Sequence, residues 1–553
     1  MKTNLYPKIP LAQAVIEIFR QKEIQHIVIS PGSRNAPLTM GFTNQEGFTC
    51  YSIADERCAA FFALGLAQQL QKPVAVVCTS GSAVLNYYPA IAEAFYSQIP
   101  LLIVSADRPK SKIDIGDGQT IRQENVFANH IVFSANLTEN ASVQNDNLIV
   151  SAIETAILQK GPVHINVPFE EPLYETLLEP TYVPKTTFST NEDAEFILDA
   201  KFISEWQSAK KKLILVGELL PNAIEQKYID SLAKDKSVLV LLEKTSNLHH
   251  PSFIDRIDTL VSTFSEEEKL NFQPDILLTF GGMVVSKRIK SLLRNYQPKQ
   301  HWHIDEIRSY DTFGCLSQHF KTNSTSFLSQ LLAENNVVES KYQNDFQSIW
   351  QDRLVKHEKY MSEIPFSDFK VFDFLSSQLP ENIQLQVSNS SPIRYLQLVP
   401  CNKTIEVFCN RGTSGIDGST STAIGAAVAN KKPTILITGD ISFLYDSNAL
   451  WNNYIPKKFK IILINNSGGG IFRILPGHQE TETFNTFFET SHHLTAEHLA
   501  KMFAFEYSSV QNEDELHAVW ESFISNQNTP SILEIFTPEK INDIVLLDYF
   551  RNL

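Results

Sequence analysis

Short apolar runs alternate along this chain with longer stretches whose apolar positions recur at helical spacing. The runs are continuous and rich in β-branched residues, which is typical of strands that are buried on both faces of a parallel sheet. Helix-like segments such as 56–69 and 83–96 lie between them. The expected strands are 24–30, 73–80, 100–106 and 162–168, then 211–217, 237–243, 275–282 and 301–305, and finally 383–390, 404–410, 433–439, 459–465 and 531–537.

These strands fall into three blocks that are separated by two polar stretches. Residues 170–199 are rich in Pro, Thr and Glu and are expected to form a linker, and residues 340–369 are polar and mostly helical. The pattern therefore predicts an α/β protein with three doubly wound parallel-sheet domains, over residues 1–175, 185–350 and 365–553.

Charge and cysteine content narrow the classes of function. With 47 basic and 62 acidic residues the formal net charge is −15, which opposes nucleic-acid binding but leaves anionic small substrates open. The six cysteines form no CxxC pair, so neither a zinc site nor a disulfide scaffold is expected, and a reducing cytoplasmic location fits. We expect no signal peptide, because Lys8, Glu17 and Arg20 interrupt the N-terminal segment. We expect no membrane span, because no apolar run approaches about 20 residues.

The carboxyl ends of two predicted strands carry the clearest candidate site. Asp440 follows strand 433–439 and Asn466 follows strand 459–465, a separation of 466 − 440 = 26 residues that suits one strand–helix–strand unit. Open α/β sheets bind ligands at such strand ends, and these oxygen ligands suit Mg²⁺ held against a diphosphate. The alternative is an ordinary Asp turn followed by a Gly-rich loop.

Together the segments ITGDIS and IILINNSGGG resemble the diphosphate-binding motif of thiamine diphosphate (ThDP) enzymes. Its usual form is GDG, about 25 to 30 further residues and then NN, and here Ile441 occupies the third position. The resemblance implies that Asp440, Asn466 and the carbonyl of Gly468 bind Mg²⁺ or Mn²⁺. It also implies that Gly439, Ile441 and Ser442 contact the diphosphate.

The segment SIADERCAAFFALG places Glu56 after a short strand and at the start of a helix. Taken alone, this is a first-turn Glu favoured by the helix dipole. The ThDP resemblance implies instead that Glu56 hydrogen-bonds N1′ of the aminopyrimidine, which favours the imino tautomer. The 4′-nitrogen of that tautomer then removes the proton from the thiazolium carbon.

A narrower resemblance is carried by SPGSRNAPL, SADRP, GQTIRQ, SKR, NSSPIR and NRGTSGIDGSTSTAIG, in this order. These segments are similar to those of the 2-succinyl-5-enolpyruvyl-6-hydroxy-3-cyclohexene-1-carboxylate (SEPHCHC) synthases of menaquinone biosynthesis. The similarity extends over about residues 7–540. It implies decarboxylation of 2-oxoglutarate and 1,4-addition of the resulting succinyl semialdehyde carbanion to isochorismate.

Both substrates are dianions, so the resemblance implies a set of fixed cations with neutral donors beside them. The implied cations are Arg34, Arg108, Lys287, Arg288, Arg394 and Arg411, and the implied neutral donors are Ser33, Gln119, Asn389 and Ser390. Ile416 is implied to wedge the cofactor into a bent shape, while Ile471 and Phe472 would line the pocket. Each cation taken alone could equally be a solvated surface residue, and Arg473 has no assigned role.

Two other functions stay open: another ThDP-dependent 2-oxoacid decarboxylase or carboligase, and a non-catalytic protein of the same fold. Decarboxylases of this superfamily often place His near the reactive centre, whereas His478, His492 and His493 lie beyond the predicted metal loop. The resemblance also implies that two chains share each active site, so we expect a homodimer or homotetramer. The central domain lacks an FAD fingerprint and is expected to be structural, or regulatory at most.

Overall fold

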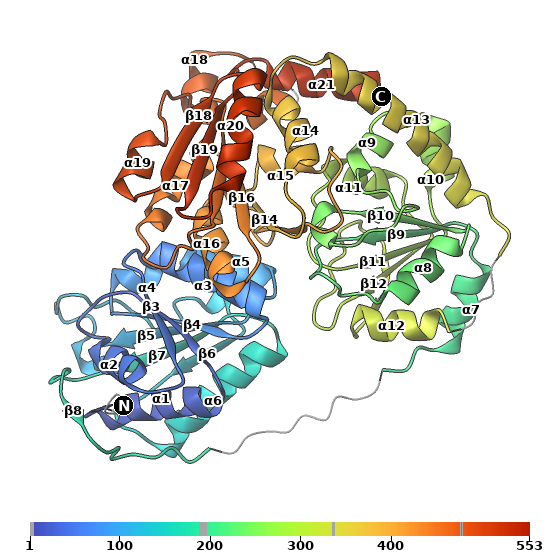
Figure 1. Cartoon of the computed structure of the whole chain (residues 1–553). Coiled ribbons are helices and arrows are strands. Elements are labelled where there is room, and N and C mark those ends of the chain that lie inside the picture. The colour runs from blue at the N-terminus through green and yellow to red at the C-terminus, as the bar shows by residue number, and fades with distance from the viewer. Residues whose placement is uncertain (1–4, 187–195, 334–337, 476, 478) are drawn as a thin grey trace.

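The computed structural model describes residues 5–186, 196–333, 338–475, 477 and 479–553. It contains three α/β units, each built on one parallel sheet with helices on both faces, and Figure 1 shows them from blue to red. The predicted fold class is therefore confirmed. The exact boundaries of the three domains stay a prediction.

The N-terminal unit has a six-stranded sheet in the order β3-β2-β4-β5-β7-β6. Helices α1, α2 and α6 pack on one face of this sheet, and α3 and α5 pack on the other. The strands are β2 (His26–Ile29), β3 (Thr49–Ser52), β4 (Val74–Cys78), β5 (Leu101–Asp107), β6 (Phe133–Asn136) and β7 (Val163–Pro168). The helices are α1 (Pro10–Gln21), α2 (Ala36–Asn44), α3 (Glu56–Leu70), α4 (Ser82–Asn86), α5 (Tyr88–Tyr96) and α6 (Val143–Leu158).

The C-terminal unit repeats this strand order as β15-β14-β16-β17-β19-β18. Helix α16 packs on the face that is directed toward the N-terminal unit, and α14, α15, α20 and α21 pack on the opposite face. The strands are β14 (Gln384–Val387), β15 (Glu406–Phe408), β16 (Thr434–Gly439), β17 (Lys460–Asn465), β18 (Glu506–Val510) and β19 (Ser531–Phe536). The helices are α14 (Asp368–Gln378), α15 (Ser391–Leu396), α16 (Ser419–Ala429), α17 (Asp440–Tyr445), α18 (Glu482–Phe484), α19 (Glu497–Met502), α20 (Glu513–Ser525) and α21 (Asn542–Asn552).

The middle unit has a five-stranded sheet in the order β10-β9-β11-β12-β13. Helices α7, α8 and α12 cover one face, and α9, α10, α11 and the start of the long helix α13 cover the other. The strands are β9 (Lys212–Val216), β10 (Val238–Leu242), β11 (Ile276–Phe280), β12 (Gln300–Ile304) and β13 (Leu316–Phe320). The helices are α7 (Ala200–Ser208), α8 (Gln226–Lys234), α9 (Ile257–Val261), α10 (Glu266–Phe272), α11 (Lys287–Asn295), α12 (Ser324–Leu331) and α13 (Tyr342–Glu363).

In the three large sheets the sequence pattern located the buried strands, and it indicated β3 only as the short strand before Glu56, but it missed three other strands at sheet edges. Strands β6, β13 and β18 each lie at an edge and are only partly buried, so their sequences FSAN, LSQHF and EYSSV contain no continuous apolar run. The predicted helix 83–96 is in fact two helices, α4 and α5, that meet at Tyr87. Pro89 in the first turn of α5 explains the break, because proline has no N–H to continue a helix.

The predicted linker 170–199 is partly folded onto the N-terminal unit. Within it, β8 (Thr176–Leu177) pairs antiparallel with β1 (Tyr6–Pro7). Residues 187–195 of this segment lie outside the described residues.

The N- and C-terminal units share one apolar core because α3 and α16 cross in direct contact, where blue meets orange in Figure 1. A Cβ added to Gly65 would lie 2.0 Å from the carbonyl oxygen of Thr422, and a Cβ added to Gly425 would lie 2.0 Å from that of Phe62. The offsets are equal, 422 − 62 = 360 and 425 − 65 = 360. Equivalent positions of two topologically equivalent helices therefore contact each other reciprocally.

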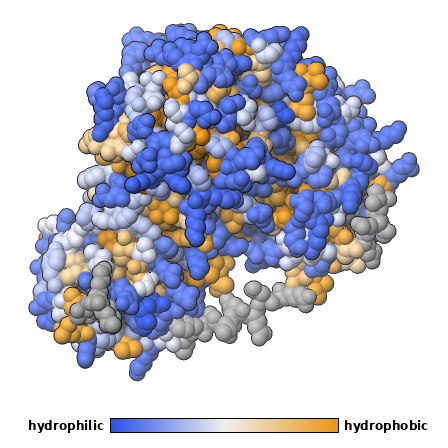
Figure 2. All heavy atoms as spheres, in the orientation of Figure 1, coloured by the Kyte–Doolittle hydropathy of each residue, from blue (hydrophilic) through white to orange (hydrophobic). Residues whose placement is uncertain are grey.

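The face shown in Figure 2 is mostly hydrophilic, with apolar side chains scattered across it. Among the described residues, none of the helices combines the length and the apolar character that a membrane crossing requires.

We predict that Gly65→Ala and Gly425→Ala each destabilise the protein by about 1–3 kcal/mol, because the new methyl group meets a backbone oxygen that cannot move without separating the helices. Thermal or urea unfolding measures the effect. Gly118→Ala is the matched control, since its Cβ would meet nothing within 4 Å. Equal stabilities of all three variants would contradict the prediction.

Candidate active site

Asp440 and Asn466 lie where the sequence placed them, at the carboxyl ends of two neighbouring parallel strands. Strand β16 ends at Gly439 and β17 ends at Asn465, and Gly439 pairs with Ile464 in the ladder between them. Both side chains are buried. The expected juxtaposition at one edge of the sheet is therefore confirmed.

Backbone donors hold the Asp440 carboxylate in place. Its Oδ1 accepts a hydrogen bond from the N–H of Ile441 at 2.7 Å, and its Oδ2 accepts one from the N–H of Gly468 at 2.9 Å. The first bond comes from helix α17, whose positive N-terminal end also favours a negative charge at this point. The carboxylate is thus fixed both to the first turn of α17 and to the glycine loop after β17.

Asn466 is oriented by a buried carboxyl group on helix α14. Its Nδ2 donates to Oδ2 of Asp368 at 2.9 Å, while Oδ1 of Asp368 accepts from the hydroxyl of Thr537 at 2.6 Å. Burial raises the pKa of Asp368 to about 6. With its nitrogen engaged, the buried Oδ1 of Asn466 is left without a hydrogen-bond partner, which is the atom a cation would use.

The glycine loop after β17 is held by a buried ion pair. Gly468 has φ of +152°, and a Cβ there would lie 2.8 Å from the carbonyl oxygen of Glu489, which also accepts the N–H of Gly469. The Glu489 carboxylate forms two hydrogen bonds with the guanidinium of Arg473, and both side chains are buried. Arg473, which had no predicted role, therefore anchors the segment opposite this loop.

His492 is closer to the site than its position in the sequence suggested. Its Nε2 lies 3.3 Å from Oδ2 of Asp440, and that carboxylate raises the pKa of the imidazole. His493 is exposed, and His478 lies outside the described residues. His492 follows the metal loop in the sequence, as noted above, but the fold brings it back to Asp440 after the π-helical turn Asn485–Glu489.

A cavity of about 290 Å³ opens above these strand ends. Apolar side chains form much of its wall, and the buried carboxylate and amide lie among its polar residues. It is lined by eleven of the predicted residues, namely Asn389, Ser390, Ile416, Gly439, Asp440, Ile441, Ser442, Asn466, Gly468, Ile471 and Phe472.

The loop after β15 forms one side of this cavity. Nδ2 of Asn389 donates to the carbonyls of Asn410 at 2.6 Å and Gly415 at 2.7 Å, which ties the two ends of the loop together. Oδ1 of Asn389 accepts from the guanidinium of Arg411 at 2.6 Å. These bonds place Arg411 beside the cavity.

Ile416 is fixed at the end of the same loop. Its carbonyl accepts a hydrogen bond from the hydroxyl of Ser442 at 2.6 Å. The predicted wedge and one predicted diphosphate contact are therefore joined directly. Ser390 next to Asn389 adopts φ of +72°, which is uncommon for a residue other than glycine and turns the chain into α15.

Two further predicted cations, Arg288 and Arg394, lie close to Asp258 of the middle unit. Burial raises the pKa of Asp258, and Arg288 and Arg394 oppose this shift. Burial, together with the nearby charge of Arg411, lowers the pKa of Arg394. Arg288 stacks on Phe550 at 3.9 Å, and Lys287 is exposed at the start of α11. None of these four cations lines the cavity itself.

The predicted residues of the N-terminal unit lie apart from this cavity. Glu56 is the first residue of α3, as expected, and accepts one hydrogen bond from Asn86 at 3.3 Å. Arg34 is buried and donates to the carbonyl of Phe169 and to Glu171, at 3.1 Å in both cases. Ser33 and Gln119 are exposed and Arg108 is half-buried. None of these five residues lines the cavity within the same chain.

Three residues that shape the site carry no motif in the sequence. Asp368 orients Asn466, His492 contacts Asp440, and Glu93 of the N-terminal unit binds the loop that contains Arg411. Each acts across at least 52 residues of chain (492 − 440 = 52). Of the three, only His492 could have been suggested by the sequence, because it is a histidine that follows the glycine loop.

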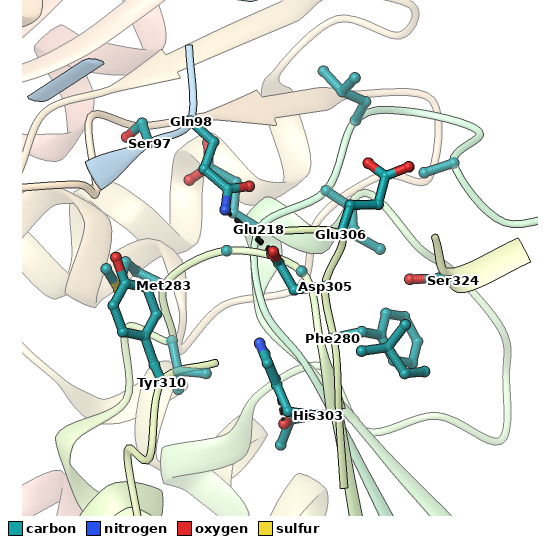
Figure 3. A pocket seen from close by; sticks show the side chains of 18 of the residues that line it. Ser97, Gln98, Glu218, Phe280, Met283, His303, Asp305, Glu306, Tyr310 and Ser324 are labelled. Carbon is teal, nitrogen blue, oxygen red and sulfur yellow. Dashed lines mark hydrogen bonds between the residues drawn. The ribbon is translucent and has the colours of Figure 1, made fainter. Parts of the chain in front are cut away.

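A second cavity of about 410 Å³ lies between the N-terminal and middle units and contains none of the predicted residues. Figure 3 shows Ser97 and Gln98 on one side of it and Glu218, Asp305 and Tyr310 on the other. Gln98 donates to both carboxylate oxygens of Asp305 at 3.3 Å. Burial, with Glu93 nearby, raises the pKa of Glu218 to about 8, and Arg411 opposes the shift.

The donor set at the strand ends fits a divalent cation. Among the described residues no group of three or more His, Cys, Asp or Glu side chains could hold a metal ion. The predicted ligand set does not depend on such a group of side chains. It combines one carboxylate, one amide oxygen without a hydrogen-bond partner and one backbone carbonyl. Hard oxygen ligands of this kind, completed by phosphate and water, are what Mg²⁺ accepts.

Three family profiles match the chain in order. Residues 9–131 match the N-terminal TPP-binding domain of thiamine pyrophosphate enzymes, residues 184–387 match the middle domain of thiamine pyrophosphate enzymes, and residues 390–535 match the C-terminal TPP-binding domain. TPP is the same compound as ThDP.

Similar proteins extend over the whole chain. A protein of Flavobacterium johnsoniae is 61% identical over 99% of this chain and 100% of its own length. A protein of Flavobacterium psychrophilum is 62% identical over 99% of this chain and 100% of its own length. A protein of Porphyromonas gingivalis is 36% identical over 97% of this chain and 96% of its own length. Each is named 2-succinyl-5-enolpyruvyl-6-hydroxy-3-cyclohexene-1-carboxylate synthase.

We predict that Glu218 makes stability depend on pH. Folding raises its pKa from 4.5 to about 8, so in this interval the folded protein keeps a proton that the unfolded chain releases. The free energy of unfolding of the wild type should therefore fall, relative to that of Glu218→Gln, as the pH rises from about 4.5 to 8. Urea unfolding at several pH values measures this difference. The exposed Glu358→Gln is the control, and parallel curves for Glu218→Gln and the wild type would refute the prediction.

Proposed function

Because the chain belongs to the family of SEPHCHC synthases, which are ThDP-dependent enzymes, we propose that the cavity at the ends of β16 and β17 is one half of its active site. The enzyme decarboxylates 2-oxoglutarate and adds the resulting four-carbon unit to isochorismate in menaquinone biosynthesis. The observation that carries the site assignment is the unpartnered Oδ1 of Asn466 beside the Asp440 carboxylate.

We infer that these residues bind the diphosphate end of the cofactor through a metal ion. Asp440, Asn466 and the carbonyl of Gly468 are the proposed ligands of Mg²⁺ or Mn²⁺. Ile441 and Ser442 lie in the first turn of α17, where a helix end favours an anion. When bound, ThDP supplies the carbon nucleophile and the electron sink for loss of CO₂.

Glu56 is the proposed partner of the aminopyrimidine. It is half-buried and its carboxylate has one long hydrogen bond, from Asn86, so it remains available to bind a ring nitrogen. A carboxyl group in this position can share a proton with that nitrogen and so promote proton removal at the reactive carbon.

The proposed substrate contacts come from all three units. Arg394 and Arg411 flank the cavity, Lys287 and Arg288 lie at the start of α11, and Arg34 and Arg108 belong to the N-terminal unit. Guanidinium groups bind carboxylates in a bidentate manner, which suits two dianionic substrates. The neutral contacts proposed beside them are Ser33, Gln119, Asn389 and Ser390, with Ile471 and Phe472 on the apolar side.

We further propose that a second copy of the chain completes each site, in a homodimer or homotetramer located in the cytoplasm. Within one chain Glu56 does not line the cavity that contains Asp440. Large apolar side chains are also exposed close to this edge of the C-terminal sheet, which is the expected state of a surface that a partner covers. They include Tyr445, Trp451, Phe472, Phe487 and Phe488.

The reaction is tested by incubating the protein with ThDP, Mg²⁺, 2-oxoglutarate and isochorismate and following isochorismate loss and CO₂ release. We predict that isochorismate is consumed only when 2-oxoglutarate is present. Glu56→Gln should lower the rate by about 10²- to 10⁴-fold, as expected for loss of an acid–base group, without preventing ThDP binding. CO₂ release without isochorismate loss would indicate a different decarboxylase or carboligase.

The shared site is tested by mixing two inactive variants, Glu56→Gln and Asp440→Asn, under conditions that allow chains to exchange. If each site uses Glu56 of one chain and Asp440 of the other, a mixed dimer contains one intact site. About half of the dimers are then mixed, so about a quarter of the wild-type activity should return. Each variant mixed with itself is the control. No recovery, despite demonstrated exchange, would place both residues in the same chain's site.

A further inference from the structure

Glu93 is a buried carboxylate that no step of the proposed reaction uses. It lies on α5 of the N-terminal unit and is 1% exposed. The loop after β15 in the C-terminal unit surrounds it, as the hydrogen bonds show. This loop contains Arg411 and Ile416 and forms a wall of the proposed active site.

Three donors of this loop bind the Glu93 carboxylate. The N–H of Gly412 donates to Oε1 at 2.7 Å, and the N–H and the hydroxyl of Thr413 donate to Oε2, each at 2.7 Å. Ser97, one turn along α5, donates its hydroxyl to Oε1 at 2.7 Å. A carboxylate can accept all four bonds, whereas an amide in its place would turn an N–H group toward at least one of these donors.

The loop is shaped for this contact. A Cβ on Gly412 would lie 2.7 Å from the backbone oxygen of Glu93 and 2.8 Å from Oγ of Ser97. Only glycine therefore allows the loop to approach α5 so closely. The position directly after Arg411 is thus constrained by the N-terminal unit, not by the cavity.

The bonds to Glu93 also act against electrostatic repulsion. Arg411 lies close enough to Arg394 and to Lys290 to lower the pKa of each, in both cases after the larger effect of burial. Repulsion between Arg411 and these two like charges favours movement of the loop away from the site. Besides the bond from Arg411 to Asn389, the attachment of residues 412 and 413 to Glu93 opposes that movement.

We propose that Glu93 is a positioning residue for substrate binding, which acts across the domain boundary by holding residues 412 and 413 so that Arg411 points to Asn389. This inference rests on the proposed function, in which Arg411 binds a substrate carboxylate. Glu93 itself contacts neither substrate nor cofactor.

The test is a double-mutant cycle between Glu93→Gln and Arg411→Gln, with steady-state kinetics for both substrates. Glu93→Gln alone should raise KM for at least one substrate by about 10- to 100-fold, as expected for loss of hydrogen bonds to a charged group, with a smaller change in kcat. In the Arg411→Gln background the same substitution should change KM by less than about twofold, because residues that act as a unit are not additive.

Two further variants separate positioning from folding. Thr413→Val removes one loop bond and should raise KM in the same direction but less. Ser97→Ala removes the bond from α5 to Glu93 and keeps all three loop bonds, so it should leave KM unchanged. Hydrogen exchange of the amides of residues 412 and 413 gives a readout that is independent of turnover. It should accelerate in Glu93→Gln and not in Ser97→Ala.

The outcomes are distinct. An inactive wild type would refute the proposed function and not this contact. An active wild type with an unchanged KM in Glu93→Gln, or with effects of Glu93→Gln and Arg411→Gln that add in full, would overturn the role of Glu93. If Glu93→Gln unfolds, Thr413→Val becomes the deciding variant. An unchanged KM in Thr413→Val would then overturn the proposed role of Glu93.

Discussion

The close crossing of α3 and α16 is the constraint on which the arrangement of the chain depends. Two glycines, Gly65 and Gly425, let each helix meet the backbone of the other, and side chains from both terminal units then share one apolar core. Because backbones touch, the crossing fixes both separation and angle more tightly than side-chain packing could. The middle unit joins this pair through α13, which contributes to its own core and to that of the C-terminal unit.

The reciprocal contact also determines where Glu56 and Asp440 lie relative to each other within one chain. The terminal sheets share one strand order, and α3 and α16 are the equivalent helices of the two units. Glu56 begins α3, whereas Asp440 follows β16, the strand that α16 leads into. The α3–α16 crossing thus joins the two units in one chain, but it leaves Glu56 out of the cavity that contains Asp440.

Local features of the sequence were sufficient to predict which residues lie at the carboxyl ends of β16 and β17. Asp440 and Asn466 each follow a buried strand directly, so the sheet alone brings them together, and the start of α3 at Glu56 is set by its neighbours in the chain. Asp368, His492 and Glu93 could not be found in this way, because their partners are 98, 52 and 319 residues distant in the sequence. No periodicity or spacing describes such contacts. The edge strands β6, β13 and β18 were missed for another reason, since partial exposure removes the apolar signal.

Several of these long-range contacts also bring buried carboxyl groups close to Arg394 and Arg411. Arg394 and Arg411 lie among carboxyl groups from two other units, Glu93 from the N-terminal one and Glu218, Glu243 and Asp258 from the middle one. Four full negative charges would offset the positive charge of these two arginines and weaken the binding of a dianion beside them. Burial instead raises the pKa of Glu218 to about 8 and that of Glu243 to about 7, so near neutral pH both carry a proton for a large part of the time. Arg394 and Arg411 are therefore surrounded by less negative charge than four ionised carboxylates would place there.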